Sequence, residues 1–275
     1  MAAETDGVDL SDPTASALAH FGNEVLLELK RTDTRASELA AVAHCHKTLV
    51  SKILAGDRLA SRQFAEACDR RFPDAHGRFV RLWRFITREA YPPWFRGYVE
   101  LEAKATRIRL FNPHLVPGLV QTEAYARAVL ATGRPPKLET AVALRMSRQH
   151  ILDRDEPPQV WVTLDESALR RTAGNAEVMH EQLGRLLTMA TTPPHVVQIV
   201  PAGHSVYHAG TSPYGVLSFA DQPDVVHVDG FPTGYVTCEE AHVAEARSAY
   251  DLLTATALGP DDSAVAIESI MKEYT

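Results

Sequence analysis

Apolar residues in the first third of the chain recur every three or four positions, the spacing of helices that bury one face. The pattern predicts five helices, at about 17–30, two within 36–56, one from Ser61 to about residue 72, and one at 77–90. The two helices within 36–56 are short and joined by a tight turn. We therefore expect an all-α domain over residues 18–92, preceded by a disordered acidic tail at 1–17.

The stretch 36–56 separates an apolar side from a polar one. Its expected buried positions are Leu39, Ala43, Cys45, Val50 and Ile53. The outer face of its second helix carries only hydrogen-bond donors and no acid, namely Lys47, Thr48, Ser51 and Lys52. A helix that enters the major groove of DNA needs such a face. An ordinary amphipathic helical hairpin is the alternative interpretation.

The segment LAAVAHCHKTLVSKILAG resembles the LA-x-x-A-x-V-S-x-x-x-V-S-x-I-x-x-G signature of lambda-repressor-like (XRE) domains. The matching positions are Leu39, Ala40, Ala43, Val50, Ser51, Ile53 and Gly56. This resemblance implies a helix-turn-helix domain that binds double-stranded operator DNA.

Three positions depart from that signature. Arg35 stands where a Ser or Thr usually caps the first helix, so we expect Thr34 or Asp33 to replace it as the cap. His44 replaces the usual turn glycine, at a position where a left-handed backbone is common. His46 replaces the serine that caps the recognition helix, and its imidazole is a poorer cap.

The candidate DNA contacts divide by expected role. Lys47 and Thr48, at the start of the recognition helix, are expected to reach base edges, with Ser51 and Lys52 on the same stripe. Two arginines near the start of the next helix, Arg58 and Arg62, are expected to hold backbone phosphate, unless they are ordinary surface residues. Arg35 completes the candidate set.

The pattern changes after the helix-breaking segment 91–95. Helices are expected at about 95–110, after Thr122, and at 138–154, 175–191, 239–258 and 261–273, with a short one at 166–171. Strands are expected at 159–164, 196–200, 214–219, 225–228 and 235–237. Together they predict an α+β domain over 93–275, with a mainly antiparallel sheet of about five strands and flanking helices.

Charge divides along the same boundary. The chain has 275 residues and a formal net charge of -7. Residues 1–17 carry -4, residues 18–96 carry +5, and residues 97–275 carry -8. This asymmetry favours a first domain that meets phosphate and a second that does not. Since no signal peptide or long apolar run is visible, we expect a cytoplasmic, nucleoid-associated protein without membrane contact, with its three cysteines reduced.

Five segments of the second domain also resemble a known group. They are VPGLVQTEAYAR, RMSRQ (145–149), LDESALRR (164–171), QLGRLL (182–187) and VVQIVP (196–201). In this order they resemble the large C-terminal domain that follows XRE domains in actinomycete regulators of the WhiJ-like group. The resemblance implies an antitoxin-like transcriptional regulator whose second domain senses a small partner protein encoded nearby.

Two constellations raise the question of catalysis. The histidines His195, His204, His208 and His227 lie close in sequence, but no cysteine or acid has metal-ligand spacing with them. Asp165 and Glu166 are adjacent, so they point apart. A Glu166–Arg170 pair is the plainer interpretation, with Arg145, Arg148 and Gln149 as possible further partners of these carboxylates. No nucleophile elbow, phosphate loop or dinucleotide fingerprint is present, so we expect no enzyme, cofactor or metal.

The sequence therefore predicts a sequence-specific DNA-binding regulator, a repressor that binds as a homodimer. Two alternatives remain open. One is an antitoxin-like protein-interaction module with weak DNA binding. The other is a regulator that responds to a small molecule, with a pocket between the sheet and the helices at 122–154.

Overall fold

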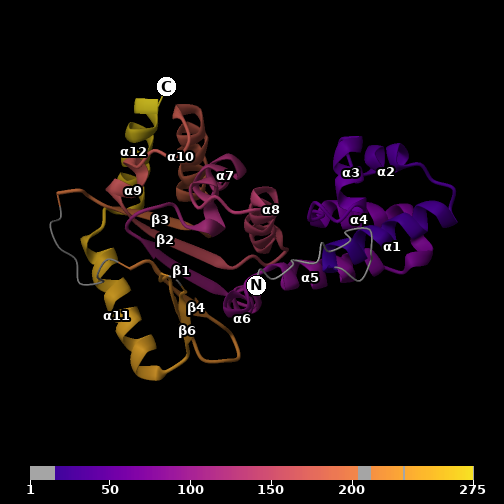
Figure 1. Cartoon of the computed structure of the whole chain (residues 1–275). Helices are drawn as coiled ribbons and strands as arrows, with labels where there is room; N and C mark the ends of the chain where they lie inside the picture. The colour runs from indigo at the N-terminus through magenta and orange to yellow at the C-terminus, as the bar shows by residue number, and fades with distance from the viewer. Residues whose placement is uncertain (1–15, 204–211, 232, 275) are drawn as a thin grey trace, which may run out of the picture. The chain divides into compact units, whose positions relative to one another are not determined.

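The computed structural model describes residues 16–203, 212–231 and 233–274 (Figure 1). The chain divides into two compact units. The helical unit comprises the described residues up to Pro93 together with Glu139–Ser147, and the sheet unit comprises Trp94–Leu138 and the chain from Arg148 onward. The expected tail at 1–17 lies almost wholly outside the described residues.

Among its described residues, the helical unit contains the five predicted helices. They are α1 (Ala17–Arg31), α2 (Ala36–Val42), α3 (Lys47–Leu54), α4 (Arg62–Arg71) and α5 (Arg78–Ala90), with the short 3-10 helix η1 (Pro73–Ala75) before α5. Their inward faces meet in one core that includes Phe21, Val25, Phe64, Phe72 and Phe79, all buried. The helical period of the apolar residues therefore located these elements correctly.

Helix α5 closes this core. Asp69 in α4 caps its start, because the carboxylate accepts the backbone N–H groups of Phe79 and Val80, both at 2.9 Å. Phe79, Trp83 and Ile86 are buried, and the indole of Trp83 donates to the carbonyl of Ala60 at 3.0 Å. The strongly amphipathic pattern of this helix thus reflects its position as a cover over the other helices.

Two glycines allow α1 to lie directly against the end of α3. A Cβ atom at Gly22 would stand 2.6 Å from the carbonyl oxygen of Leu54 and would also collide with that of Ile53. A Cβ atom at Gly56 would stand 2.9 Å from the Cα atom of Ala19. Because nothing but hydrogen fits at either position, the approach of the two helices fixes where α3 lies.

The sheet unit alternates helices and strands. Its helices are α6 (Pro93–Glu102), α7 (Glu123–Thr132), α9 (Glu166–Arg170), α10 (Ala176–Thr191), α11 (Glu240–Thr256) and α12 (Pro260–Met271). Helix α8 (Leu138–Arg148) lies between α7 and β2 in the sequence, but most of its residues belong to the helical unit. Its strands are β1 (Arg107–Asn112), β2 (Gln159–Asp165), β3 (Val196–Val200), β4 (Tyr214–Ser218), β5 (Val225–Val228) and β6 (Tyr235–Thr237). Short 3-10 helices are η2 (Gly118–Val120), η3 (Gln149–Asp153) and η4 (Lys272–Tyr274).

The sheet corrects the predicted five-stranded, mainly antiparallel one. In the described part of the chain it has six strands in the order β3-β2-β1-β4-β5-β6. β1, β2 and β3 run parallel, while β4, β5 and β6 are antiparallel to their neighbours. The parallel half follows from the helices between these strands, because a strand that returns through a helix enters the sheet in the same direction.

The predicted helix at 95–110 was wrong in its second half, since α6 ends at Glu102 and β1 begins at Arg107. In β1, Ile108 and Leu110 are buried while Arg107 and Arg109 are half-buried, which is the period of two that a strand requires. The arginines on the alternate positions hid this strand signal.

Both faces of the sheet are covered at least in part. One face packs against α10 and α12, through residues such as Ile108, Val162 and Leu183. The other face packs against α11, through Phe111, Val216 and Tyr250 among others. Figure 1 shows α10 and α12 on one side of the strands and α11 on the other. None of the helices in the described residues combines the length and hydropathy that crossing a membrane requires.

We expect Gly22→Ala to lower the free energy of unfolding by about 1–3 kcal/mol, the usual cost of forcing an extra methyl group into a packed contact. Urea unfolding followed by circular dichroism measures this. Gly97→Ala in α6 is the matched control, because nothing lies within 4 Å of its Cβ position. The control should be neutral or stabilising, and equal effects of the two changes would contradict the close approach of α1 and α3.

Candidate nucleic-acid interface

The turn between α2 and α3 is closed by a pair of backbone hydrogen bonds. The N–H of Cys45 donates to the carbonyl of Ala40 at 2.9 Å, and the N–H of His44 donates to that of Ala41 at 3.2 Å. This is the Schellman arrangement, which places the residue after the C-cap in the left-handed region. His44 occupies that position with φ of 49°. The sequence prediction of a left-handed residue at His44 is therefore confirmed.

The other end of α3 is closed in the same way. The N–H of Gly56 donates to the backbone carbonyl of Ile53 at 3.0 Å, and the N–H of Asp57 donates to the backbone carbonyl of Lys52 at 2.9 Å. Gly56 has φ of 73° and follows the C-cap residue Ala55. Both ends of the turn-and-helix segment are thus held by the backbone itself.

The replacement cap expected for α2 is absent, whereas His46 does cap α3. His46 caps α3, since its Nδ1 atom accepts the backbone N–H of Thr48 at 3.3 Å and lies 2.9 Å from the hydroxyl of the same residue. Helix α2 begins after Arg35 without a side-chain cap. Thr34 does not cap it, because its hydroxyl accepts a hydrogen bond from Nη2 of Arg71 at 2.7 Å. Asp33 does not either, and lies instead in the left-handed region with φ of 49°.

The outer face of α3 is open. Lys47, Thr48, Ser51 and Lys52 are all exposed, while Val50 and Ile53 on the opposite face are buried with 0% and 1% of their surface exposed. Leu39 in α2 is buried as predicted. The predicted burial of Ala43 and Cys45 is only half correct, because both are half-buried at the edge of the turn.

The lysines on this face form no ion pair with any of the described residues. Helix α3 itself contains no acid. An exposed helix face that carries positive charge without a nearby acid is available to a negatively charged partner.

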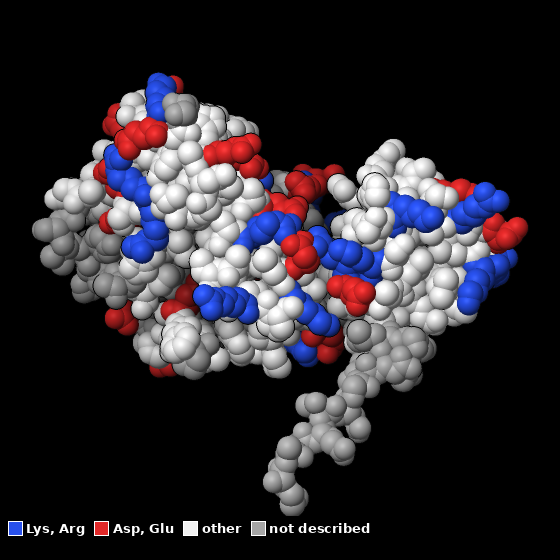
Figure 2. Space-filling model, turned by 45° about the horizontal axis from the view of Figure 1, so that its top comes forward, with Lys and Arg blue, Asp and Glu red and all other residues white. Residues whose placement is uncertain are grey.

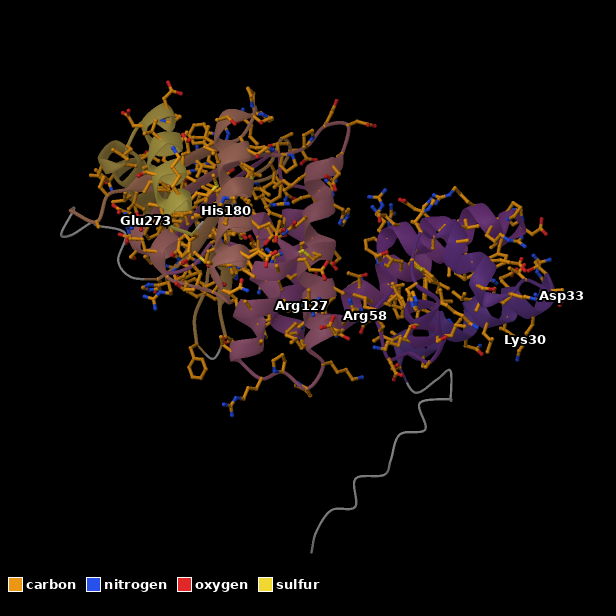
Figure 3. The ribbon with its side chains drawn as sticks, turned by 90° about the horizontal axis from the view of Figure 1, so that it is seen from above. Lys30, Asp33, Arg58, Arg127, His180 and Glu273 are labelled. Atoms are coloured by element: carbon orange, nitrogen blue, oxygen red, sulfur yellow. The ribbon has the colours of Figure 1, made fainter. Side chains whose placement is uncertain are left out.

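The arginines at the start of α4 differ, because each already has a carboxylate partner. Arg58 forms an ion pair with Glu139, and Nε of Arg62 lies 2.8 Å from the carboxylate of Glu66 one turn later. Arg35 is exposed. Sequence reasoning missed the first pair, since its residues lie 81 positions apart. In Figure 3, Arg58 lies at the end of the helical unit opposite Lys30 and Asp33.

Basic side chains elsewhere on the helical unit are scattered, and some of them stand beside acids. On the face that Figure 2 shows, Lys and Arg side chains stand at several separate points, with Asp or Glu beside some of them. Pairs such as Arg78 with Glu28, at 2.7 Å, account for part of this surface. The carboxylate-free stripe of α3 is therefore a local feature.

In the sheet unit, the histidines do not form a metal site among the described residues. His195 lies just before β3 and His227 lies in β5, and β2, β1 and β4 stand between those two strands in the sheet. Burial lowers the pKa of each imidazole. His204 and His208 lie outside the described residues.

The predicted Glu166–Arg170 pair is confirmed, with Nε of Arg170 at 2.8 Å from the carboxylate. Glu166 also accepts the backbone N–H of Ala202 at 3.0 Å. The suggested partners Arg148 and Gln149 point elsewhere. Arg148 forms a two-pronged ion pair with buried Glu102, at 2.8 and 2.6 Å. Sequence reasoning did not single out Glu102.

Three of the five sequence segments that resembled a known group meet in one hydrogen-bond network around η2. Gln149 donates to the carbonyls of Gly118 and Gln121, at 3.2 and 2.7 Å. Gln182 donates to Val120 at 3.0 Å and accepts the N–H of Thr122 at 2.7 Å. These side chains satisfy the irregular backbone around η2, which gives the segment 116–122 a single conformation.

We expect His44→Gly to raise the free energy of unfolding by about 0.5–1 kcal/mol, because glycine relieves the left-handed strain while adding some freedom to the unfolded chain. Urea unfolding measures the change. His20→Gly, the same replacement on an exposed position inside α1, should destabilise instead. Destabilisation by both would contradict the left-handed turn.

Glu166→Gln should lower the midpoint of thermal unfolding at pH 7. The N–H of Ala202 and the guanidinium of Arg170 hold the pKa of this carboxyl below its ordinary value. Its contribution is therefore complete above the unfolded pKa of about 4.3 and is lost as the pH falls through the lower folded pKa. The difference from wild type should shrink accordingly in acid.

Glu268→Gln is the control, because its ion pair with Lys272 at 2.9 Å is exposed. It should change the midpoint little at any pH. A pH-independent loss in Glu166→Gln would show that the charge is not what stabilises the contact.

Comparison with known proteins identifies the sheet unit. The family described as Domain of unknown function (DUF5753) matches residues 95–269, from α6 into α12. This domain is often paired with XRE-type helix-turn-helix regulators, although no helix-turn-helix family matches this chain. No curated protein and no solved structure matches it either. Since the match spans more than half of the 275 residues, the chain belongs to the DUF5753 family.

Proposed function

We propose that the protein is a sequence-specific DNA-binding regulator of transcription, a repressor whose α3 enters the major groove. One observation carries this proposal. An exposed helix face without carboxylates, bearing Lys47, Thr48, Ser51 and Lys52, stands on a helix that is closed at both ends. The pairing of DUF5753 with XRE-type regulators supports it.

The dimensions of α3 suit this role. A helix of eight residues is about 12 Å long, and its diameter of about 10–12 Å fits a major groove about 12 Å wide. Lys47 and Thr48 lie in the first turn, from which side chains reach base edges in helix-turn-helix complexes. Lysine pairs with guanine oxygen and nitrogen acceptors, and threonine accepts or donates to several bases.

Arg35, Arg58 and Arg62 are proposed to hold backbone phosphates. For Arg58 and Arg62, a phosphate must replace the carboxylate with which each arginine pairs in the free protein, that of Glu139 and that of Glu66 respectively. Breaking these ion pairs costs part of the binding free energy. While they are intact, they weaken the attraction of these arginines for other anions. Domains of this kind bind as two-fold dimers to half-sites about 34 Å apart, and we propose a homodimer on that basis.

The sheet unit is proposed to receive the regulatory signal from a small partner protein. Its acidic balance, -8 over residues 97–275, makes it an unsuitable surface for DNA and separates the two tasks. A second candidate function is an antitoxin-like interaction module that binds DNA weakly. The existing ion pairs of Arg58 and Arg62 favour this second candidate, since they reduce the charge left for phosphate.

The test is a DNA-binding measurement on duplexes that wild-type protein selects from its own genomic fragments. Lys47→Ala/Lys52→Ala should weaken binding by about 1–3 kcal/mol for each lost base contact, measured by fluorescence anisotropy. Lys30→Ala/Lys104→Ala is the matched control, since it removes two exposed lysines away from α3 and should bind like wild type.

The salt dependence of the same measurement separates the two candidates. For a DNA-binding regulator, the logarithm of the association constant should fall linearly with the logarithm of the salt concentration, with a slope of about -0.9 for each phosphate neutralised. A shallow slope together with equal binding by both double variants would reject α3 as the contact surface and favour the interaction module.

A further inference from the structure

Two arginines and a tryptophan lie together on the face of the sheet that α11 partly covers. Arg107 and Arg109 alternate with the buried residues of β1, so both point to this face. In the parallel register, Arg109 lies directly opposite Trp161 of β2, and Arg107 lies opposite Gln159. These positions place three large side chains on adjacent strands within reach of one another.

The cations rest on the tryptophan ring. The guanidinium carbons of Arg107 and Arg109 lie 5.4 and 5.6 Å from the centroid of Trp161. That of Arg109 also lies 6.0 Å from the ring of Tyr250 in α11, and Nε of Arg107 donates to Gln159 at 2.9 Å. Aromatic contacts of this kind hold a guanidinium in place while leaving its N–H edge available.

Neither arginine has a counter-ion among the residues that the structure describes. Within the described residues, no carboxylate lies within ion-pair distance of Arg107 or Arg109. Asp224, which lies beyond the end of β4 where Ser218 pairs with Arg107, is already bound by Arg247 and by the hydroxyl of Ser218. No described carboxylate thus compensates these two adjacent positive charges, although residues 97–275 carry a net charge of -8.

Two buried donors at this place also lack an acceptor. Nε of Arg109 and Nε1 of Trp161 are both shielded from solvent and make no hydrogen bond. A buried donor without a partner costs about 1–3 kcal/mol, so native proteins rarely leave two of them beside each other. An acceptor supplied from outside the chain would satisfy the guanidinium and its neighbour together.

The cluster is accessible from one side. Helix α11 covers the far ends of these strands, where the hydroxyls of Thr163 and Tyr250 lie 3.0 Å apart and Phe111 is buried. At the near ends, Arg107, Gln159 and Trp161 are all half-buried. The sheet face therefore has a covered half that holds Arg109 in position and a half through which a ligand can approach.

We propose that Arg107, Arg109 and Trp161 form a binding site for a compact oxyanion, a small ligand that carries a phosphate or carboxylate group. The planar N–H edges of two guanidinium groups match the oxygens of either group. A compact ligand suits the site better than a nucleic acid or an acidic chain, because an extended polyanion would also meet a unit whose net charge is -8 over residues 97–275. This site is independent of DNA binding by α3.

The test is isothermal titration of the full-length protein with inorganic phosphate, pyrophosphate and citrate, at constant ionic strength set with chloride. We expect saturable binding of one ligand per chain for at least one of these probes, accompanied by a change in tryptophan fluorescence. Arg107→Gln/Arg109→Gln should weaken that binding at least tenfold. Arg171→Gln, an exposed arginine of the same unit, should leave it unchanged. Phosphate probes and citrate distinguish the two sources of oxyanion.

Three results would overturn the site. They are no saturable binding of any probe, equal binding by wild type and the double variant, and tighter binding of a hexaglutamate peptide than of every small probe. The last would assign the arginines to an acidic protein segment. Should the double variant fail to fold by circular dichroism, Arg107→Lys keeps the charge and must still weaken binding several-fold, because the flat N–H edge is lost.

Discussion

The position of α3 depends on the contact between its C-terminal end and α1. Gly22 and Gly56 bring the backbones of these elements so close that a single methyl group does not fit at either place. Packed backbone is stiffer than packed side chains, because it has no rotamers through which to yield. Val50 and Ile53 then anchor the inner face of α3 in the core. Once this face is fixed inward, Lys47, Thr48, Ser51 and Lys52 are left on the outside.

Charge is arranged to complement that geometry. Several arginines of the helical unit are held by acids, as Arg78 is by Glu28 and Arg62 by Glu66. Lys47 and Lys52 have no acidic partner within the described residues, although the chain as a whole is acidic. The same contrast occurs in the sheet unit, where Arg148 is buried against Glu102 while Arg107 and Arg109 pair with no carboxylate of the described chain.

Local features of the fold could be predicted from the sequence because their causes are local. The helices of the helical unit follow from apolar spacing. The caps of α4 and α7 follow from Ser61 and Thr122, whose hydroxyls each accept the backbone N–H three residues on. The left-handed turn at His44 was predicted from a position normally taken by glycine. The exposed donor stripe on α3 required only the helical period.

Features that depend on distant residues could not be predicted in this way. Strand β1 was missed because Arg107 and Arg109 occupy its alternate positions, and with it the sixth strand and the parallel half of the sheet. The ion pair of Arg58 with Glu139 and that of Arg148 with Glu102 join residues far apart in sequence. No spacing rule connects such partners, and they decide which cations remain free for a ligand.

The central claim is that the outer face of α3 contacts DNA. Amide chemical-shift mapping by NMR, with a genomic duplex selected by the wild-type protein, tests it most directly. The account predicts that the largest changes fall on residues 47–52, with smaller ones near Arg35 and the start of α4. Changes confined to the sheet unit, or a spectrum that the duplex leaves unaltered, would contradict it.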